Sequence, residues 1–139
     1  MSLERFIDAQ ARIWPVPLEE IRAERKATHW MWFVFPQIAG LGRSSTAQLY
    51  GIVDLKEAQD YLAHEVLGPR LIKISEAVLA HKDAAPEAIL GPVDALKLRS
   101  SMTLFQVAGG GLVFGQVLAA FYAGENCPKT LEMLRDAPA

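Results

Sequence analysis

The chain contains a single cysteine, Cys127, and no excess of charge of either sign. One cysteine excludes an internal disulfide, so we expect a reducing compartment and a cytoplasmic location. The net charge of −2 at neutral pH lacks the basic excess that is typical of nucleic-acid binding, so we expect no nucleic-acid partner. Acidic and basic residues are mixed in the first few positions, and no apolar segment of a secretory signal is visible there.

Patterns typical of metal binding and of covalent catalysis are also missing. His29, His64 and His81 are scattered and show no ligand spacing with a carboxylate or with Cys127. No Gly-x-Ser-x-Gly motif occurs, and Cys127 precedes a proline, as a residue at the entry to a helix does. The glycine triplet 109–111 follows a predicted helix rather than a strand, and it is not followed by the Gly-Lys-Ser/Thr sequence of a phosphate-binding loop. We expect no metal site and no cofactor, and the sequence leaves open whether the protein is an enzyme.

One long stretch, residues 100–124, carries no charged side chain and is long enough to span a bilayer. It contains the glycine triplet 109–111, and each glycine disfavours a continuous helix by about 1 kcal/mol relative to alanine. Two buried helices separated by a glycine loop explain the stretch better, so we expect no membrane partner.

The chain has 139 residues, of which 51% are hydrophobic, and this suffices for one domain with a core of its own. Apolar residues recur at helical spacing and no segment alternates with a period of two. The predicted fold is an all-α, single compact multihelical domain over residues 1–139, with about seven or eight helices. Most predicted helix starts are marked by a side chain that can cap the helix: Thr28, Ser44 or Ser45, Asp54 and Asp94. One predicted helix starts instead at a Gly-Pro pair, with Gly68 as its N-cap.

An aromatic run, residues 30–35, reads Trp-Met-Trp-Phe-Val-Phe and is flanked by His29 and Gln37. Its length fits a buried strand or a short buried helix that begins at Thr28 and ends before Pro36, and we favour the helix because no strand partner is evident. The run is either a core segment with polar ends or one wall of a ligand pocket with His29 and Gln37 at its rims.

The predicted helix 95–108 is apolar on more than one side, so we expect it to be mostly buried. Lys97 and Ser101, one turn apart on this helix, are then expected to be partly buried as well. A partly buried ammonium group needs a partner. Lys97, Ser100 and Ser101 are therefore candidates for an anion or phosphate site. The alternative is an internal ion pair of Lys97 with Asp94 or Glu20, with serine hydroxyls bonded back to helix carbonyls.

Two long motifs, residues 29–37 followed by Gly-Leu-Gly at 40–42 and residues 94–105, closely resemble domain-of-unknown-function family 1810. The resemblance covers nearly the whole chain and implies a mainly helical bacterial protein with no established activity. Family members tend to carry an acidic residue where this chain has Cys127. Some members are labelled calpastatin-like, but calpastatin-type inhibitors are long disordered chains, unlike this apolar sequence. The family is also loosely similar to small hydrolases of ADP-ribose-type N-glycosidic bonds.

Two hypotheses of function follow. In the first, the protein binds or hydrolyses a nucleotide-like, ADP-ribose-type small molecule: its rings stack on Trp30 or Trp32, Lys97 holds the phosphate together with the serines, and Glu20 or His29 moves a proton. The predicted pocket residues are Glu20, His29, Trp30, Trp32, Gln37, Lys97, Ser100 and Ser101. In the second, the protein is a non-catalytic interaction module whose exposed apolar face docks a partner or a second copy, as a homodimer.

Overall fold

The computed structural model describes residues 2–136 of the chain and contains helices but no strand within them. Its helices, in chain order, are α1 (Glu4–Ala11), α2 (Val16–Arg22), α3 (Met31–Val34), α4 (Ser45–Leu49), α5 (Leu55–Ala63), α6 (Leu67–Leu79), α7 (Pro86–Leu90), α8 (Pro92–Val107), α9 (Leu112–Tyr122) and α10 (Pro128–Asp136). The all-α prediction is confirmed. The described residues form ten helices rather than seven or eight, and three of them, α3, α4 and α7, are only four or five residues long.

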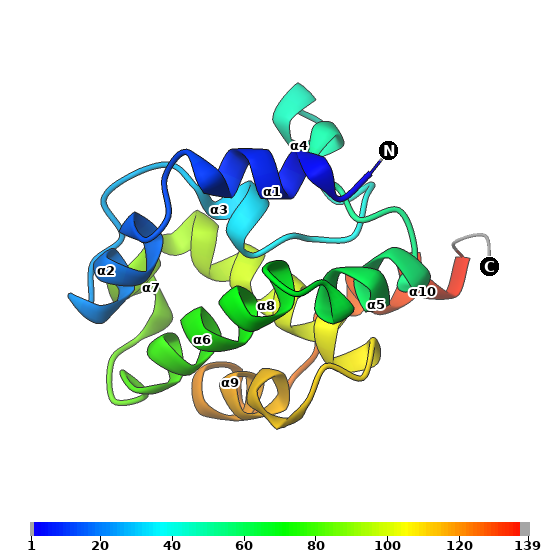
Figure 1. Ribbon diagram of the computed structural model, residues 1–139. Coiled ribbons are helices and arrows are strands. Elements are labelled where there is room, and N and C mark those ends of the chain that lie inside the picture. Colours follow the sequence, from blue (N-terminus) through cyan, green and yellow to red (C-terminus); the bar gives the residue numbers. More distant parts are fainter. Residues whose placement is uncertain (1, 137–139) are drawn as a thin grey trace.

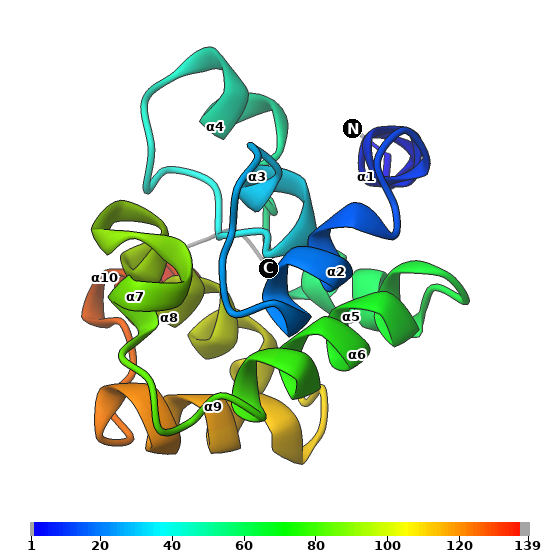
Figure 2. The same cartoon turned by 90° about the vertical axis from the view of Figure 1, so that its left-hand side faces the viewer.

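Helix α8 is the centre of the packing, with α5, α7, α9 and α10 against it (Figure 1). Its residues from Ser100 to Phe105 are all buried, whereas Val93, Leu96 and Val107 are exposed, so the expectation of a mostly buried helix is confirmed only for the stretch 100–105 in the second half of α8. Helices α6 and α9 pack on each other at one end of the molecule, while α4 and its loops project from the opposite end (Figure 2). In the described part of the chain no helix is both long and apolar enough to cross a membrane.

Aromatic rings join four helices through the core. Phe6 of α1 meets Tyr61 of α5 edge to face at 5.2 Å between ring centroids, Tyr61 meets Phe105 of α8 at 5.3 Å, and Phe105 meets Phe114 of α9 at 5.8 Å. All four are completely buried. Each such ring contributes about 1.5–3 kcal/mol by leaving water, so this series fixes α8 relative to the N-terminal half of the chain.

Side chains at helix starts explain several boundaries. Ser44 Oγ accepts from the Ala47 N–H at 3.1 Å and Asp54 Oδ1 accepts from the Glu57 N–H at 2.8 Å, which confirms both predicted caps. Helix α6 begins at Leu67, so Gly68 lies inside its first turn rather than before it. A Cβ at Gly68 would lie 2.1 Å from the carbonyl oxygen of Leu62, so the close approach of the end of α5 requires glycine there.

Two predicted caps have other roles. Thr28 does not cap the aromatic run, because its hydroxyl donates to Glu20 at 2.7 Å, and α3 begins only at Met31. Asp94 does not cap α8, because that helix already begins at Pro92, with Gly91 at the N-cap. The Asp94 carboxylate is therefore free to bind two lysines.

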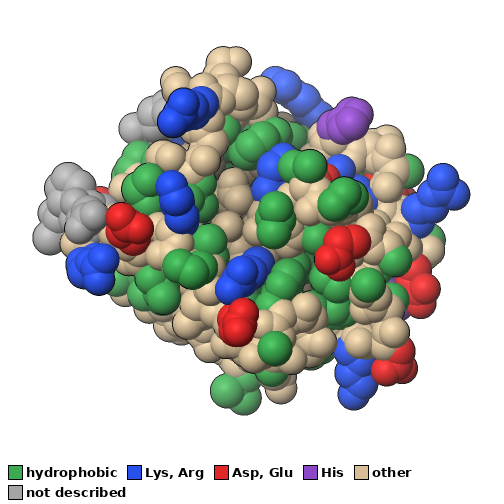
Figure 3. All heavy atoms as spheres, turned by 180° about the vertical axis from the view of Figure 1, so that it is seen from behind, with side chains coloured by type: hydrophobic (Ala, Val, Ile, Leu, Met, Phe, Trp, Pro, Cys, Tyr) green, Lys and Arg blue, Asp and Glu red, His purple; other side chains and the backbone are tan. Residues whose placement is uncertain are grey.

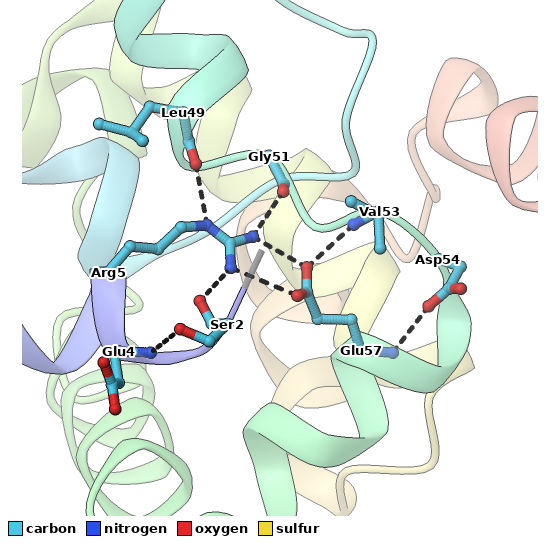
Figure 4. Close-up of polar contacts among 8 residues, drawn as sticks. All are labelled: Ser2, Glu4, Arg5, Leu49, Gly51, Val53, Asp54 and Glu57. Atoms are coloured by element: carbon cyan, nitrogen blue, oxygen red, sulfur yellow. Dashed lines mark hydrogen bonds and ion pairs between the residues drawn. The ribbon is translucent and has the colours of Figure 1, made fainter.

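Arg5 connects three segments that are far apart in the sequence (Figure 4). Its guanidinium binds both carboxylate oxygens of Glu57, at 2.9 and 3.3 Å. It also donates to the carbonyls of Leu49 at 2.8 Å and Gly51 at 2.9 Å, and to that of Ser2. All five N–H groups of Arg5 thus have acceptors, as a nearly buried guanidinium requires. The contact holds the Gly51 segment against α1 and α5.

The segment after the aromatic run is held in turn by the backbone of Ile52. The Ala39 N–H donates to the Ile52 carbonyl at 2.7 Å, and the Ile52 N–H donates to the Gln37 carbonyl at 2.9 Å. These two bonds fix the backbone of Gln37 next to α3.

Candidate functional site

A pocket of about 340 Å³ lies where the aromatic run meets α8 and the start of α10. Its walls come from four separate segments and are formed by Trp32, Gln37, Leu41, Gly42, Val93, Leu96, Lys97, Ser100, Cys127 and Lys129. We call it the Trp32–Lys97 pocket. Figure 3 shows the molecule from behind, where hydrophobic side chains lie next to Lys and Arg side chains on the surface.

Trp32 forms the aromatic wall of the Trp32–Lys97 pocket. The one-turn helix α3 sends Trp30 into the core, where 1% of it is exposed, and leaves Trp32 half-buried at the pocket. Gly42 packs beside the Trp32 ring, and a Cβ there would lie 2.6 Å from the Cβ of Ala47. No larger residue fits at Gly42 without a shift, so the glycine lets the loop lie against the ring.

Lys97 of α8 covers the face of Trp32, with its Nζ 3.9 Å from the ring centroid. This is a cation–π contact, and 18% of the Lys97 side chain is exposed. Its Nζ also lies 3.2 Å from Asp94 Oδ1. The ion pair with Asp94 that the sequence offered as an alternative is therefore present, but the ammonium also faces the pocket.

Asp94 is shared between two lysines. Lys26 Nζ lies 2.9 Å from Asp94 Oδ2, and only 7% of the Lys26 side chain is exposed. Partial burial raises the pKa of Asp94, but the contacts from Lys26 and Lys97 outweigh it and hold that pKa below its ordinary value. Two ammonium groups thus share one carboxylate, and a positive charge remains at the pocket wall.

The α9–α10 connection is tied to α8 beside the pocket. Arg99 donates to the carbonyls of Glu125 at 3.0 Å and Asn126 at 2.7 Å, and the Cys127 N–H donates to Thr103 Oγ1 at 2.9 Å. Ser100 Oγ donates to the Leu96 carbonyl at 3.2 Å and lies 3.4 Å from Cys127 Sγ. These contacts place the Cys127 thiol in the pocket.

Of the residues predicted for the site, Trp32, Gln37, Lys97 and Ser100 line the Trp32–Lys97 pocket together. The structure thus brings together the aromatic run and the lysine–serine helix and leaves a cavity between them. The Ser100 hydroxyl also bonds back to its own helix, as the alternative from the sequence expected.

Glu20 lies outside the pocket lining, with its carboxylate fully engaged. It accepts from the N–H groups of Ala27 at 2.8 Å and Thr28 at 3.1 Å, from the Thr28 hydroxyl, and from Trp30 Nε1 at 2.9 Å. Partial burial works to raise the pKa of Glu20, but these hydrogen bonds outweigh it and lower the pKa to about 2. In this arrangement Glu20 holds the chain between α2 and α3 in place and is ionised at neutral pH.

His29, Trp30 and Ser101 also lie outside the lining. His29 is exposed on the connection that precedes α3. Trp30 belongs to the core, and the Lys26 ammonium lies 5.1 Å from its ring centroid. Ser101 is completely buried, and its hydroxyl has no hydrogen-bond partner within residues 2–136.

Sequence reasoning missed Cys127 and Lys129 as pocket residues. The prediction that Cys127 stands at a helix entry is confirmed, since it directly precedes α10. Its place in the pocket depends on α10 packing beside α8, about 30 positions away in the sequence, and no local pattern indicates that contact.

Other hollows offer less chemistry. A larger one, of about 710 Å³, lies between α6 and α9 and is lined by Glu76, Leu79, Ala80, Lys82, Gln116, Ala119 and Ala120. It contains no aromatic ring, and its charged side chains, Glu76 and Lys82, are exposed. Over the described range 2–136, no three His, Cys, Asp or Glu side chains gather closely enough to hold a metal ion.

Comparison with known proteins identifies the family of the chain. The family model described as Protein of unknown function (DUF1810) matches residues 1–134. The chain belongs to the DUF1810 family. This DUF1810 protein is also similar to a solved structure, the crystal structure of the conserved hypothetical protein Rv1873 from Mycobacterium tuberculosis, with 48% sequence identity, 96% of each chain covered and a TM-score of 0.93. No curated protein matches the chain.

Proposed function

We propose that this DUF1810 protein binds a small anionic, ring-bearing molecule of the mononucleotide type in the Trp32–Lys97 pocket. The observation that carries the proposal is the shared carboxylate of Asp94. Lys26 and Lys97 divide one negative charge between them, and Lys129 adds a further positive charge at the pocket. A partly buried cationic wall of this kind favours an anionic group of a ligand.

Trp32 gives the ligand a second anchor. The ring face that Lys97 now covers is the surface on which a planar base can stack, and the side chain of Lys97 is long enough to turn toward a phosphate instead. Gln37 lies at the pocket wall with an amide that can donate to and accept from a base edge.

The size of the pocket favours one ring and one phosphate group over a longer ADP-ribose-type molecule. Its volume of about 340 Å³ lies at the small end of the roughly 300–1,000 Å³ range of small-molecule sites. We propose binding rather than hydrolysis, because Glu20 and His29, the two proton-transfer candidates, lie outside the lining.

A thermal-shift titration with mononucleotides, ADP-ribose and inorganic phosphate tests the proposal. At a ligand concentration of about 100 times Kd the stabilisation is about 2.7 kcal/mol, which raises the Tm of a domain of this size by several degrees. Lys97→Met keeps the apolar part of the side chain and removes its charge, and should abolish most of the shift.

Lys73→Met is the matched control, because Lys73 is exposed on α6 and lines another hollow. It should keep the full shift. If every ligand leaves the Tm unchanged at millimolar concentration, or if Lys97→Met and Lys73→Met give equal shifts, the proposal is wrong.

A second candidate, homodimer formation, is supported by the apolar rim of the same pocket. Val93 and Leu96 are 65% and 66% exposed and lie three positions apart on α8. Light scattering separates the two functions: a stable dimer that Leu96→Glu converts to a monomer favours the interaction module, whereas a monomer at all concentrations removes it.

A further inference from the structure

The sulfur of Cys127 lies where a cavity, a helix start and two hydroxyl groups meet. It lines the Trp32–Lys97 pocket, and Ser100 Oγ lies 3.4 Å from it. The backbone N–H groups of Lys129 and Thr130, in the first turn of α10, also face it. Unpaired N–H groups at a helix start stabilise a negative charge.

Thr130 provides an independent sign that this corner is built around an anion. Its side chain is 0% exposed, and its hydroxyl lies beside the Cys127 sulfur but has no hydrogen-bond partner among the described residues. A buried hydroxyl without a partner is costly. A thiolate, or an anionic group attached to the sulfur, gives the hydroxyl a strong acceptor.

The surroundings also make the thiol easier to ionise. Burial raises the pKa of Cys127, but the Ser100 hydroxyl and the polar groups in the first turn of α10 outweigh burial and hold the pKa below its ordinary value. The thiolate is the nucleophilic form of cysteine. Cys127 is also the only cysteine of the chain, so any thiol reaction of the protein takes place there.

We propose that Cys127 is a modification site, whose thiolate exchanges with small anionic disulfides that enter the Trp32–Lys97 pocket. In this step the Cys127 sulfur attacks one sulfur of the disulfide and forms a new S–S bond. The original S–S bond breaks, and the other half leaves as a thiol or thiolate. The Cys127 thiol is oxidised and the incoming disulfide is reduced, so no other reactant is needed.

Lys97 and Lys129 determine the charge of the reagent. Both line the same pocket as Cys127, so their charges raise the local concentration of an anionic disulfide and stabilise the departing thiolate. The attached half then occupies the pocket. That last consequence, closure of the pocket to its ligand, rests on the proposed function.

The test compares two aromatic disulfides, the anionic dithiobis(nitrobenzoate) and the uncharged dithiodipyridine, by the absorbance of the thiol they release. We expect the full chain to react faster with the anionic reagent, after each rate is divided by that of free cysteine at the same pH. Lys97→Met and Lys129→Met should each lower the anionic rate by about three- to five-fold and leave the neutral rate within about two-fold.

Matched variants complete the experiment. Lys73→Met should change neither rate, and Cys127→Ser should release no thiol. Ser100→Ala removes one hydroxyl from the sulfur and should raise the midpoint of the pH–rate profile, with circular dichroism confirming that the variant is folded. Rates equal to those of free cysteine with both reagents, or no effect of either lysine substitution, overturn the proposal.

The two proposals fail separately. The exchange is measured without any nucleotide, so it does not depend on ligand binding. Exchange that a millimolar mononucleotide does not slow counts against the ligand site and leaves the modification site standing. A Lys97-dependent thermal shift together with an unreactive Cys127 refutes the modification site and supports the ligand site.

Discussion

Replacing Glu20 with glutamine tests whether this carboxylate is structural. The side chain accepts four hydrogen bonds that hold residues 27–30 against α2. Glutamine has one oxygen in place of two and no charge, so it cannot satisfy all four donors. We therefore expect Glu20→Gln to destabilise the fold.

The magnitude follows from the pKa of Glu20. A change from 4.5 to about 2 is about 2.5 units, or about 3.4 kcal/mol at 1.36 kcal/mol per unit. Because most of the carboxylate surroundings are open to solvent, which screens these interactions, we reduce this to about 1–2 kcal/mol at neutral pH. That is a substantial part of the roughly 5–15 kcal/mol stability of a typical domain.

The effect should depend on pH with a definite sign. The pKa of Glu20 is lower in the folded state than in the unfolded state, so its contribution is fully present above pH 4.5 and is lost as the pH falls toward about 2. Less than half of it should remain near pH 3. The difference in free energy of unfolding between wild type and Glu20→Gln should shrink accordingly.

Urea denaturation followed by circular dichroism, at about pH 7 and about pH 3, measures this difference. Glu19→Gln is the control, because Glu19 is the exposed neighbour on the same helix and should leave stability nearly unchanged at both pH values. An equal loss from the two substitutions, or a loss from Glu20→Gln that is the same at both pH values, refutes the reasoning.

Two further substitutions test how the fold positions the site. Arg5→Lys removes the planar fork that binds both Glu57 oxygens and leaves backbone carbonyls without donors, so we expect a loss of about 2–4 kcal/mol in urea denaturation; a loss below about 0.5 kcal/mol contradicts a structural role for this contact. Gly68→Ala places a Cβ 2.1 Å from the Leu62 carbonyl oxygen and should lower the Tm by several degrees. Gly115 lies inside α9, where an added Cβ meets only the movable end of the Gln106 side chain of α8, so Gly115→Ala should be neutral or stabilising by up to about 1 kcal/mol. Equal Tm changes in these two glycine variants contradict the packing of α5 on α6.

Local chemistry explains why part of the fold was predictable. Ser44 and Asp54 cap helices through side chains three positions from the N–H they bind, and such short-range pairs are visible in the sequence. The apolar pattern of α8 likewise indicated the burial of residues 100–105, but Leu96 and Val107, which belong to the same pattern, are exposed.

Tertiary contacts explain the errors. Thr28 has a side chain suited to a cap, but its hydroxyl donates to Glu20 on the preceding helix. The Asp94 carboxylate forms ion pairs with two lysines instead of capping α8. Four of the eight predicted residues line the pocket, because Trp32, Gln37, Lys97 and Ser100 belong to two conspicuous motifs. Cys127 and Lys129 join them only through the packing of α10 on α8.

An NMR titration with a mononucleotide tests the central claim, ligand binding in the Trp32–Lys97 pocket, most directly. We expect shifts of the Trp32 indole, the Gln37 side-chain amide and the backbone amides of Gly42, Cys127 and Lys129, saturating together with one dissociation constant. Shifts confined to the α6–α9 hollow, or no shifts at millimolar nucleotide, would contradict it.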